Sequence, residues 1–261
     1  IRLLKIILIT FVIRKKHKMS KNSILYILLG FIITLTACNN SSTLGKNTMV
    51  VKGQIEGLRK GTVYLQKIKD SVLINIDSLT IDGIPNFEFR QEISTPEVYF
   101  LYLNKEDNDS LNDRILFFGE KGEIVINTLL NTFESSAKVT GSENQVLLQE
   151  YRSISRKFDE QNLNYVKGYL NAIQTKLDDA VIDSIQTGID NLLKRRYLYA
   201  LNFASNNGDN VIAPYIALTE VYDANIKLLD TVASKLSEEV KASKYGKELL
   251  NFIAERKKDG E

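Results

Sequence analysis

The chain has 261 residues, with 34 Lys and Arg against 32 Asp and Glu, a formal net charge of +2, and 44% apolar and 25% charged residues. This composition is that of an ordinary globular protein, which excludes a disordered chain, a collagen-like fibre and a membrane protein of many spans. The chain holds one His, one Cys and no Trp, so an internal disulfide framework and the usual Cys/His metal sites are excluded as well.

The basic charge is concentrated at the N-terminus. Residues 1–38 contain seven Lys and Arg and no acidic residue, and taking these seven from 34 leaves 27 basic against 32 acidic residues in 39–261, a net charge of −5. A protein body that binds nucleic acid is expected to carry a basic stripe or excess. The sequence therefore predicts no nucleic-acid partner.

Residues 19–38 have the three zones of a secretory signal peptide. A positive start at Met19 to Asn22 is followed by an apolar run, Ile24 to Leu35, and by the small residues that precede Cys38. The apolar run has about a dozen residues, whereas a membrane-spanning helix needs roughly 20. We interpret residues 1–18, which precede Met19, as a non-native upstream extension.

Leu35-Thr36-Ala37-Cys38 resembles the lipobox of bacterial lipoproteins. In that family the Cys thiol receives a diacylglycerol, the leader is cut before the Cys, and the new amine is usually acylated, for example with palmitate. The resemblance implies cleavage between Ala37 and Cys38, lipidation of Cys38, and firm attachment to a membrane by two or three acyl chains. The alternative is an uncleaved signal anchor. The polar residues that follow favour cleavage, since residues 39–48 are typical of a tether.

Residues 49–140 are predicted to form an antiparallel β-sandwich or barrel-like domain, because short runs rich in β-branched and aromatic residues are separated by Gly- and Asp-containing turns. The expected strands are 50–55, 62–68, 78–81, 87–89, 98–103, 114–118 and 123–126. Pro85 and Pro96 fall at strand ends, where a missing N–H does little harm.

From Gly141 onward the apolar residues recur at intervals of three and four, which predicts an all-helical segment over 141–261 with long helices. Ser142 is expected to cap the first helix, and Asp178-Asp179 to separate two long ones. Residues 205–210 are predicted to be a loop, Pro214 lies in the first turn of a further helix, and Ser243 precedes a last one. The fold class is therefore α+β. The apolar stripe of the long helices comprises Leu170, Ile173, Leu177, Val181, Ile185, Ile189 and Leu192.

Several stretches, in their order, resemble one known family. They are Val51-Lys52-Gly53, Gly61 to Leu65, Phe87-Glu88-Phe89, Gly122 to Ile126, Val139 to Ser142, Ala213-Pro214, Leu236 to Lys241 and Tyr245-Gly246-Lys247. The resemblance is to the N-terminal domain of unknown function of Bacteroidetes lipoproteins that carry a thioredoxin-like domain after it, and it covers most of 49–257. That family implies a thiol–disulfide module with a Cys-x-x-Cys site. The present sequence has no Cys-x-x-Cys and ends about where that module is expected to begin, so redox activity is assigned to no residue.

Few side chains suggest chemistry. If Met19 is the start and Cys38 is lipidated, the mature chain has no His and no thiol, which excludes a Ser-His-Asp triad and a Cys nucleophile. We therefore predict no catalytic residue and no cofactor, and we favour a non-enzymatic role without excluding an enzyme. The segment Asp107 to Asp113 is rich in oxygen ligands, but Leu111 takes a ligand position and no Gly makes the turn, so we predict a solvated loop and no metal.

Asp followed by Ser or Thr and an aliphatic residue is similar to the O-glycosylation sequon of exported Bacteroidetes proteins. The candidate acceptors are Ser71, Ser78, Ser110, Ser184 and Thr231. We favour Ser110, because its neighbours predict an exposed loop. The alternative is that Asp-Ser pairs simply favour turns and caps.

These observations predict a lipid-anchored lipoprotein of the cell envelope. The lack of acidic residues after Cys38 favours a periplasm-facing location. The expected role is a non-enzymatic binding or scaffolding module, with the membrane as one partner and a protein or a second copy, bound through the long helices, as another.

Two alternatives stay open. The chain could be the N-terminal accessory part of a thioredoxin-like thiol–disulfide oxidoreductase whose catalytic module lies beyond Glu261. It could also bind a glycan or peptide on an aromatic platform of Tyr99 and Tyr102, although both residues fit a core strand better.

Overall fold

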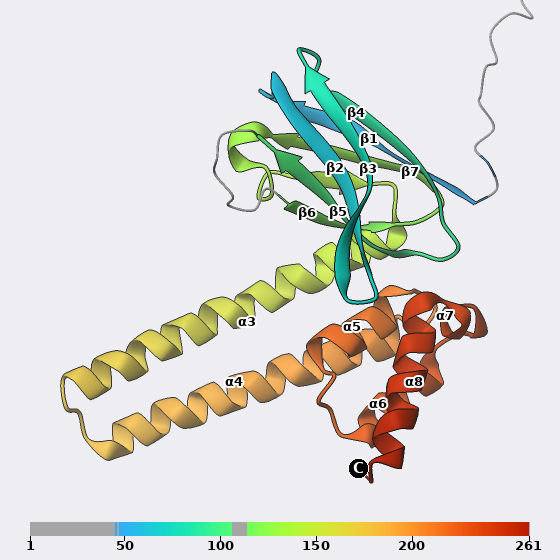
Figure 1. Cartoon of the computed structure of the whole chain (residues 1–261). Helices are drawn as coiled ribbons and strands as arrows, with labels where there is room; N and C mark the ends of the chain where they lie inside the picture. The colour runs from blue at the N-terminus through green and yellow to red at the C-terminus, as the bar shows by residue number, and fades with distance from the viewer. Residues whose placement is uncertain (1–44, 46, 106–113, 261) are drawn as a thin grey trace, which may run out of the picture. The chain divides into compact units, whose positions relative to one another are not determined.

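The computed structural model describes residues 45, 47–105 and 114–260 (Figure 1). The predicted lipidation and cleavage residues Ala37 and Cys38, the acceptor Ser110 and the segment Asp107 to Asp113 lie outside the described residues. Among the helices of the described ranges, none is both long enough and apolar enough to span a membrane.

Eight strands in the described part form a sandwich of two four-stranded sheets, followed by helices, so the α+β sandwich prediction is confirmed. The first sheet has the order β4 (Asn86–Glu92), β1 (Thr48–Glu56), β7 (Gly122–Leu129), β8 (Lys138–Thr140). The second has the order β3 (Val72–Asp82), β2 (Lys60–Lys69), β5 (Glu97–Asn104), β6 (Arg114–Gly119). Alternate side chains of both sheets, such as Val51, Leu65, Phe117 and Ile126, fill the space between them.

The first sheet is mixed rather than purely antiparallel. β1 and β7 run parallel, from the pair Met49 and Gly122 to the pair Glu56 and Leu129. Hairpins force antiparallel pairing only on strands that follow each other in the chain, and the whole second sheet lies between β1 and β7 in sequence. Gly53 permits the close approach of these strands, since a Cβ there would overlap the backbone carbonyl of Ile126.

The strand expected at 78–81 is in fact eleven residues long and starts at Val72. Asp70 and Ser71 form the preceding turn with φ of 49° and 65°. Two successive left-handed residues are what a type I′ hairpin turn requires. Asp-Ser is a weaker signal for that turn than Asn-Gly, so no hairpin is predicted here from the sequence. The three-residue strand β8 also had no recognisable pattern.

The helical part begins directly after the sandwich. Its helices are α3 (Glu143–Gln174), α4 (Asp179–Asn206), α5 (Ile212–Glu220), α6 (Ile226–Lys235), α7 (Glu238–Ala242) and α8 (Lys244–Lys258), and a 3₁₀ turn, η2 (Leu130–Thr132), lies between β7 and β8. The side chains of Ser142, Asp178 and Ser243 accept hydrogen bonds from the first turns of α3, α4 and α8, so these predicted starts are confirmed. α4 continues through Asn206, which makes the first two residues of the predicted loop helical.

Helices cover one end of the outer face of the second sheet. Val98 and Phe118 belong to the same buried cluster as Leu148, Ile212 and Leu249 of the helices. Two buried hydrogen bonds fix the first turn of α3. The backbone N–H of Phe118 donates to Gln145 Oε1 at 2.9 Å, and that of Ile212 donates to Asn144 Oδ1 at 2.9 Å.

Beyond this core, α3 and α4 continue side by side as an antiparallel hairpin (Figure 1). With 32 residues, α3 is about 48 Å long at 1.5 Å per residue. We call residues 159–193 the distal hairpin. Along its seam Ala172 and Leu192 are buried, and Gly188 lies against the ring of Tyr165.

Candidate binding surface

One face of α3 starts in the helical core and continues into solvent. In the first half of the helix Leu148 and Ser155 are buried on this face. At helical spacing from them along the same face, Leu163, Val166, Leu170 and Ile173 are 52%, 38%, 60% and 49% exposed. The apolar stripe is thus continuous in sequence, whereas the helices that cover it end part of the way along.

The same change occurs on α4. Ala200 and Ala204 are buried in the helical core, and the positions that continue their face toward the turn are Leu193, Ile189 and Ile182. Leu193 is 49% exposed, and the two Ile residues are partly exposed. The two helices are antiparallel, and the described face of each one enters the same helical core. The two faces therefore lie on the same side of the hairpin.

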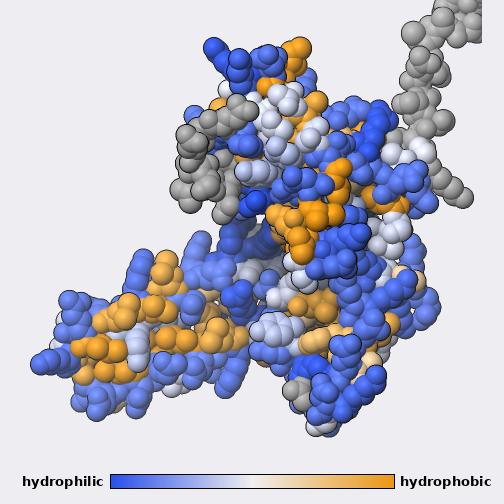
Figure 2. Space-filling view, in the orientation of Figure 1, coloured by the Kyte–Doolittle hydropathy of each residue, from blue (hydrophilic) through white to orange (hydrophobic). Residues whose placement is uncertain are grey.

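We call this surface the hairpin face. It consists of Leu163, Val166, Leu170, Ile173, Ile182, Ile189 and Leu193. Figure 2 shows apolar side chains gathered along the hairpin, between polar ones. Leu198, 55% exposed, lies five residues from Leu193 and therefore on a different side of α4.

Polar contacts between the two helices also hold the hairpin together. The guanidinium of Arg196 lies 3.1 Å from Asp159 Oδ1, and Arg195 donates to Gln161 at 3.4 Å. Near Tyr165 the seam is hollowed between Gln161, Asn164, Gly168 and Ile185. Around Tyr165 and Gly168 the side chains between the two helices are small or polar. The distal hairpin therefore has no tight apolar core between α3 and α4.

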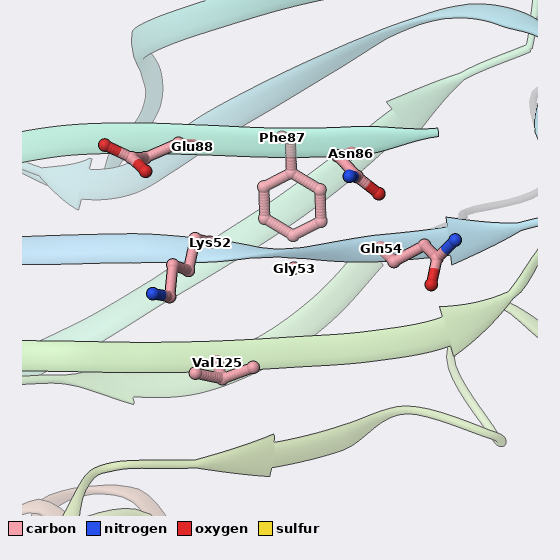
Figure 3. Close-up of a pocket in the computed structure, with 7 residues that line it drawn as sticks. All are labelled: Lys52, Gly53, Gln54, Asn86, Phe87, Glu88 and Val125. Atoms are coloured by element: carbon pink, nitrogen blue, oxygen red, sulfur yellow. The ribbon is translucent and has the colours of Figure 1, made fainter. Parts of the chain in front are cut away.

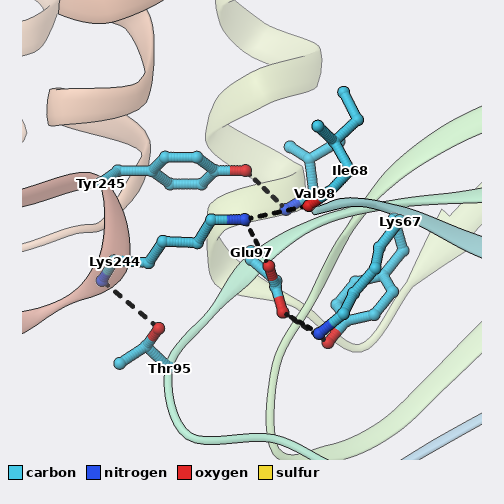
Figure 4. Close-up of polar contacts among 8 residues, drawn as sticks. Lys67, Ile68, Thr95, Glu97, Val98, Lys244 and Tyr245 are labelled. Atoms are coloured by element: carbon cyan, nitrogen blue, oxygen red, sulfur yellow. Dashed lines mark hydrogen bonds and ion pairs between the residues drawn. The ribbon is translucent and has the colours of Figure 1, made fainter. Parts of the chain in front are cut away.

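A second polar group lies where the helices meet the sandwich (Figure 4). Glu97, 9% exposed, accepts from Lys67 Nζ at 2.9 Å, from Lys244 Nζ at 2.7 Å and from the Tyr99 hydroxyl at 3.1 Å. Burial by itself would raise the pKa of Glu97, but the hydrogen bonds and charges of Lys244 and Lys67 outweigh it and hold that pKa below its ordinary value. Burial, with the negative charge of Glu97, raises the pKa of Tyr99.

This cluster attaches α8 to β5. Lys244 is the first residue of α8, and the hydroxyl of the neighbouring Tyr245 accepts a hydrogen bond from the N–H of Val98 at 3.0 Å. A carboxylate that is ionised and already contacted by two ammonium groups is a poor acid or base. We therefore assign Glu97 a structural role.

The outer face of the first sheet carries a shallow groove (Figure 3). It is lined by Lys52, Gly53, Gln54, Asn86, Phe87, Glu88 and Val125. Its charged groups already have partners, since Lys52 lies 2.7 Å from Glu123 and Glu88 lies 2.6 Å from Arg90. The groove therefore offers a weaker case for a binding site than the hairpin face.

The four predicted O-glycosylation acceptors that the structure describes are exposed but scattered. Ser71 lies in the β2–β3 turn, Ser78 on β3, Ser184 on α4 and Thr231 on α6. The Thr231 hydroxyl donates to the carbonyl of Lys227 at 2.8 Å. They do not form a common site, and their modification stays a prediction.

The aromatic platform suggested by the sequence does not form from Tyr99 and Tyr102. Tyr99 is buried inside the sandwich, while Tyr102 lies on the outer face, with its ring centre 5.7 Å from that of Tyr64. The guanidinium of Arg114 lies 4.6 Å from the Tyr102 ring. The sequence could identify Tyr64 as the neighbour of Tyr102 only if the pairing of β2 with β5 were known. In the described ranges no cluster of three or more His, Cys, Asp and Glu is arranged to hold a metal.

Comparison with known proteins gives one match. A family model described as "Domain of unknown function (DUF4369)" matches residues 49–148. No curated protein and no solved structure matches significantly. The match supports the N-terminal part of the family resemblance. Residues 49–148, which comprise the sandwich and the turns of α3 that contact it, are thus similar to a family of unknown function, and the hairpin face lies outside the matched region.

Proposed function

We propose that this protein is a lipid-anchored lipoprotein of the cell envelope that acts as a non-enzymatic binding or scaffolding module, with the hairpin face as its protein-binding surface. The observation that carries this proposal is the exposure of Leu163, Val166, Leu170 and Ile173 on the same face of α3 that is buried nearer the sandwich. Single exposed apolar residues are common, whereas a contiguous apolar surface marks an interaction site.

The energetic argument rests on these side chains. Complete burial of a large aliphatic side chain is worth about 1.5–3 kcal/mol. Since the side chains of the hairpin face are about half buried already, covering them would add about 1 kcal/mol each. Seven such residues supply enough apolar surface for the centre of a protein interface, which is surrounded by polar residues in typical complexes.

The anchor is proposed from Cys38 and the residues after it. A tether over 39–48 would span at most about 35 Å when extended. The sandwich would then lie near the membrane. Gln145 in the first turn of α3 contacts β6, and the hairpin extends away from this contact. It would therefore be available to a partner in the envelope.

Site-specific photo-crosslinking in cells tests the binding surface. A photoreactive residue at position 166 or 170 is expected to give a covalent protein adduct, because both positions lie on the hairpin face. The same residue at position 198, which is 55% exposed on a different side of α4, is the matched control for position 170, which is 60% exposed. Absence of adducts at 166 and 170, or equal yields at 198, would refute the proposed surface.

A second candidate is the N-terminal accessory part of a thiol–disulfide oxidoreductase. It rests on the sequence resemblance to lipoproteins that carry a thioredoxin-like module after such a domain, while the family match at residues 49–148 gives a domain of unknown function. The test is the reading frame after codon 261. A downstream Cys-x-x-Cys supports this candidate, and a stop codon removes it.

A further inference from the structure

We propose that the occupant of the hairpin face is a second copy of this chain, whose own hairpin packs antiparallel on the same face. This inference rests on the proposed function, since it names the partner of that surface. Pairing through one self-complementary patch gives a closed two-fold dimer, the commonest arrangement of soluble oligomers.

The apolar positions of α3 fit such a pairing. If two copies of α3 pair antiparallel about Gly168, Leu163 of one lies level with Ile173 of the other, and Val166 lies level with Leu170. All four are the large exposed apolar residues of the distal part of this face. Every apolar side chain therefore meets another apolar side chain across the two-fold axis.

The positions of α4 fit the same axis. Antiparallel pairing about residues 187–188 places Ile182 of one copy level with Leu193 of the other, while Ile189 lies level with Gln186. Tyr165 of α3 lies against Gly188 of α4, so the centres of the two helices are at the same height on the hairpin to within about one helical turn. One two-fold axis can therefore serve both helices.

The charges on α4 select the antiparallel orientation. Its N-terminal half carries Asp179 and Asp183, and its C-terminal half carries Lys194. Antiparallel pairing brings the acidic half of each copy to the basic half of the other, whereas parallel pairing would oppose like charges. Within the part of the chain that the structure describes, neither Asp183 nor Lys194 forms an ion pair with its own protomer, and such rim charges govern orientation more than affinity.

The result would be a four-helix bundle made of two hairpins. In a bundle each helix buries an apolar stripe against its neighbours. A lone hairpin has only the thin seam around Gly168 and Tyr165, and a second layer would cover the hairpin face. The overlap is limited to the distal hairpin, because the core helices α5 and α6 occupy the same side nearer the sandwich.

Cysteine crosslinking of the full-length lipoprotein tests the register. Leu163→Cys and Ile173→Cys are made as separate variants and co-expressed with different tags. We expect a disulfide dimer between the two variants but little from either alone, because residue 163 lies about 15 Å along the axis from its own symmetry mate. Dimers from each single variant alone would indicate parallel pairing and overturn the proposal.

The oligomeric state of the detergent-purified protein gives an independent measurement. Light scattering is expected to show twice the chain mass for the native protein and for Leu198→Glu, and the mass of one chain for Leu170→Glu with unchanged helical circular dichroism. A monomeric native protein overturns self-pairing. If photo-crosslinks at 166 and 170 then join a different protein, the proposed function survives. If they join no protein and the hairpin binds phospholipid vesicles instead, both proposals fail.

Discussion

Replacing Glu97 by Gln tests the attachment between the sandwich and α8. The change keeps the shape of the side chain but leaves the ammonium groups of Lys67 and Lys244, 2.9 and 2.7 Å away, beside a neutral amide. Removing one partner of a fully buried ion pair costs about 3–5 kcal/mol. The two lysine side chains are 30% and 34% exposed, so water compensates part of this, and we expect a loss of about 2 kcal/mol.

The assay is urea or thermal unfolding at several pH values. At neutral pH the loss corresponds to a fall in melting temperature of about 4–8 °C for a protein of this size. The lowered pKa of Glu97 fixes the sign of the pH dependence. Its stabilisation is present in full above the unfolded value of about 4.3, and it is lost as the pH falls through the lower folded value.

The difference between the native protein and Glu97→Gln is therefore expected to be constant at neutral pH, to shrink as the pH falls below the unfolded value of about 4.3, and to vanish once the pH is below the lower folded pKa, where the native carboxyl is neutral too. Glu88→Gln is the matched control, because Glu88 and its partner Arg90 are both about half exposed, and we expect it to cost less than about 0.5 kcal/mol. An equal loss in both variants, or a difference that persists unchanged in acid, would refute this account of Glu97.

Three further changes test other parts of the molecule. Tyr245→Phe removes the hydroxyl that accepts from the Val98 N–H, so chemical denaturation should show a loss of about 1–2 kcal/mol, and no loss would mean that water replaces the hydroxyl. Gly53→Ala places a methyl group on the Ile126 carbonyl; we expect at least about 2 kcal/mol of destabilisation by thermal unfolding, and native stability would contradict the close β1–β7 approach. Cys38→Ala should abolish fatty-acid labelling and leave the precursor uncut on a gel, whereas a cut and membrane-bound variant would disprove the lipobox.

Local features of the fold could be predicted from the sequence. Ser142, Asp178 and Ser243 each cap the start of a helix. The side chain of each accepts a hydrogen bond from a backbone N–H no more than three residues later. Such a cap depends only on neighbouring residues, so it is visible in the sequence. The parallel pairing of Val51 with Ile124 joins residues far apart in the chain, and no local pattern encodes it.

The binding surface could be predicted only in part. The stripe from Leu170 to Leu192 has helical spacing whether its side chains are buried or exposed. In the structure Leu192 is buried in the seam and Leu170 is exposed. The difference depends on where α5 and α6 stop covering the hairpin, which is a property of tertiary packing. The turn at 175–178 also divides the stripe between two helices and changes which of its residues share a face.

The contacts at the base of the hairpin give its exposed end a defined direction. Gln145 and Asn144, in the first turn of α3, bind backbone groups of β6 and of α5 through buried hydrogen bonds. Buried polar groups of this kind are costly to leave without a partner, so the first turn cannot rotate without losing them. Since α3 is continuous from this turn to Gln174, the direction of the hairpin face is set relative to the sandwich. A partner bound on the hairpin face would therefore be held in one orientation relative to the sandwich.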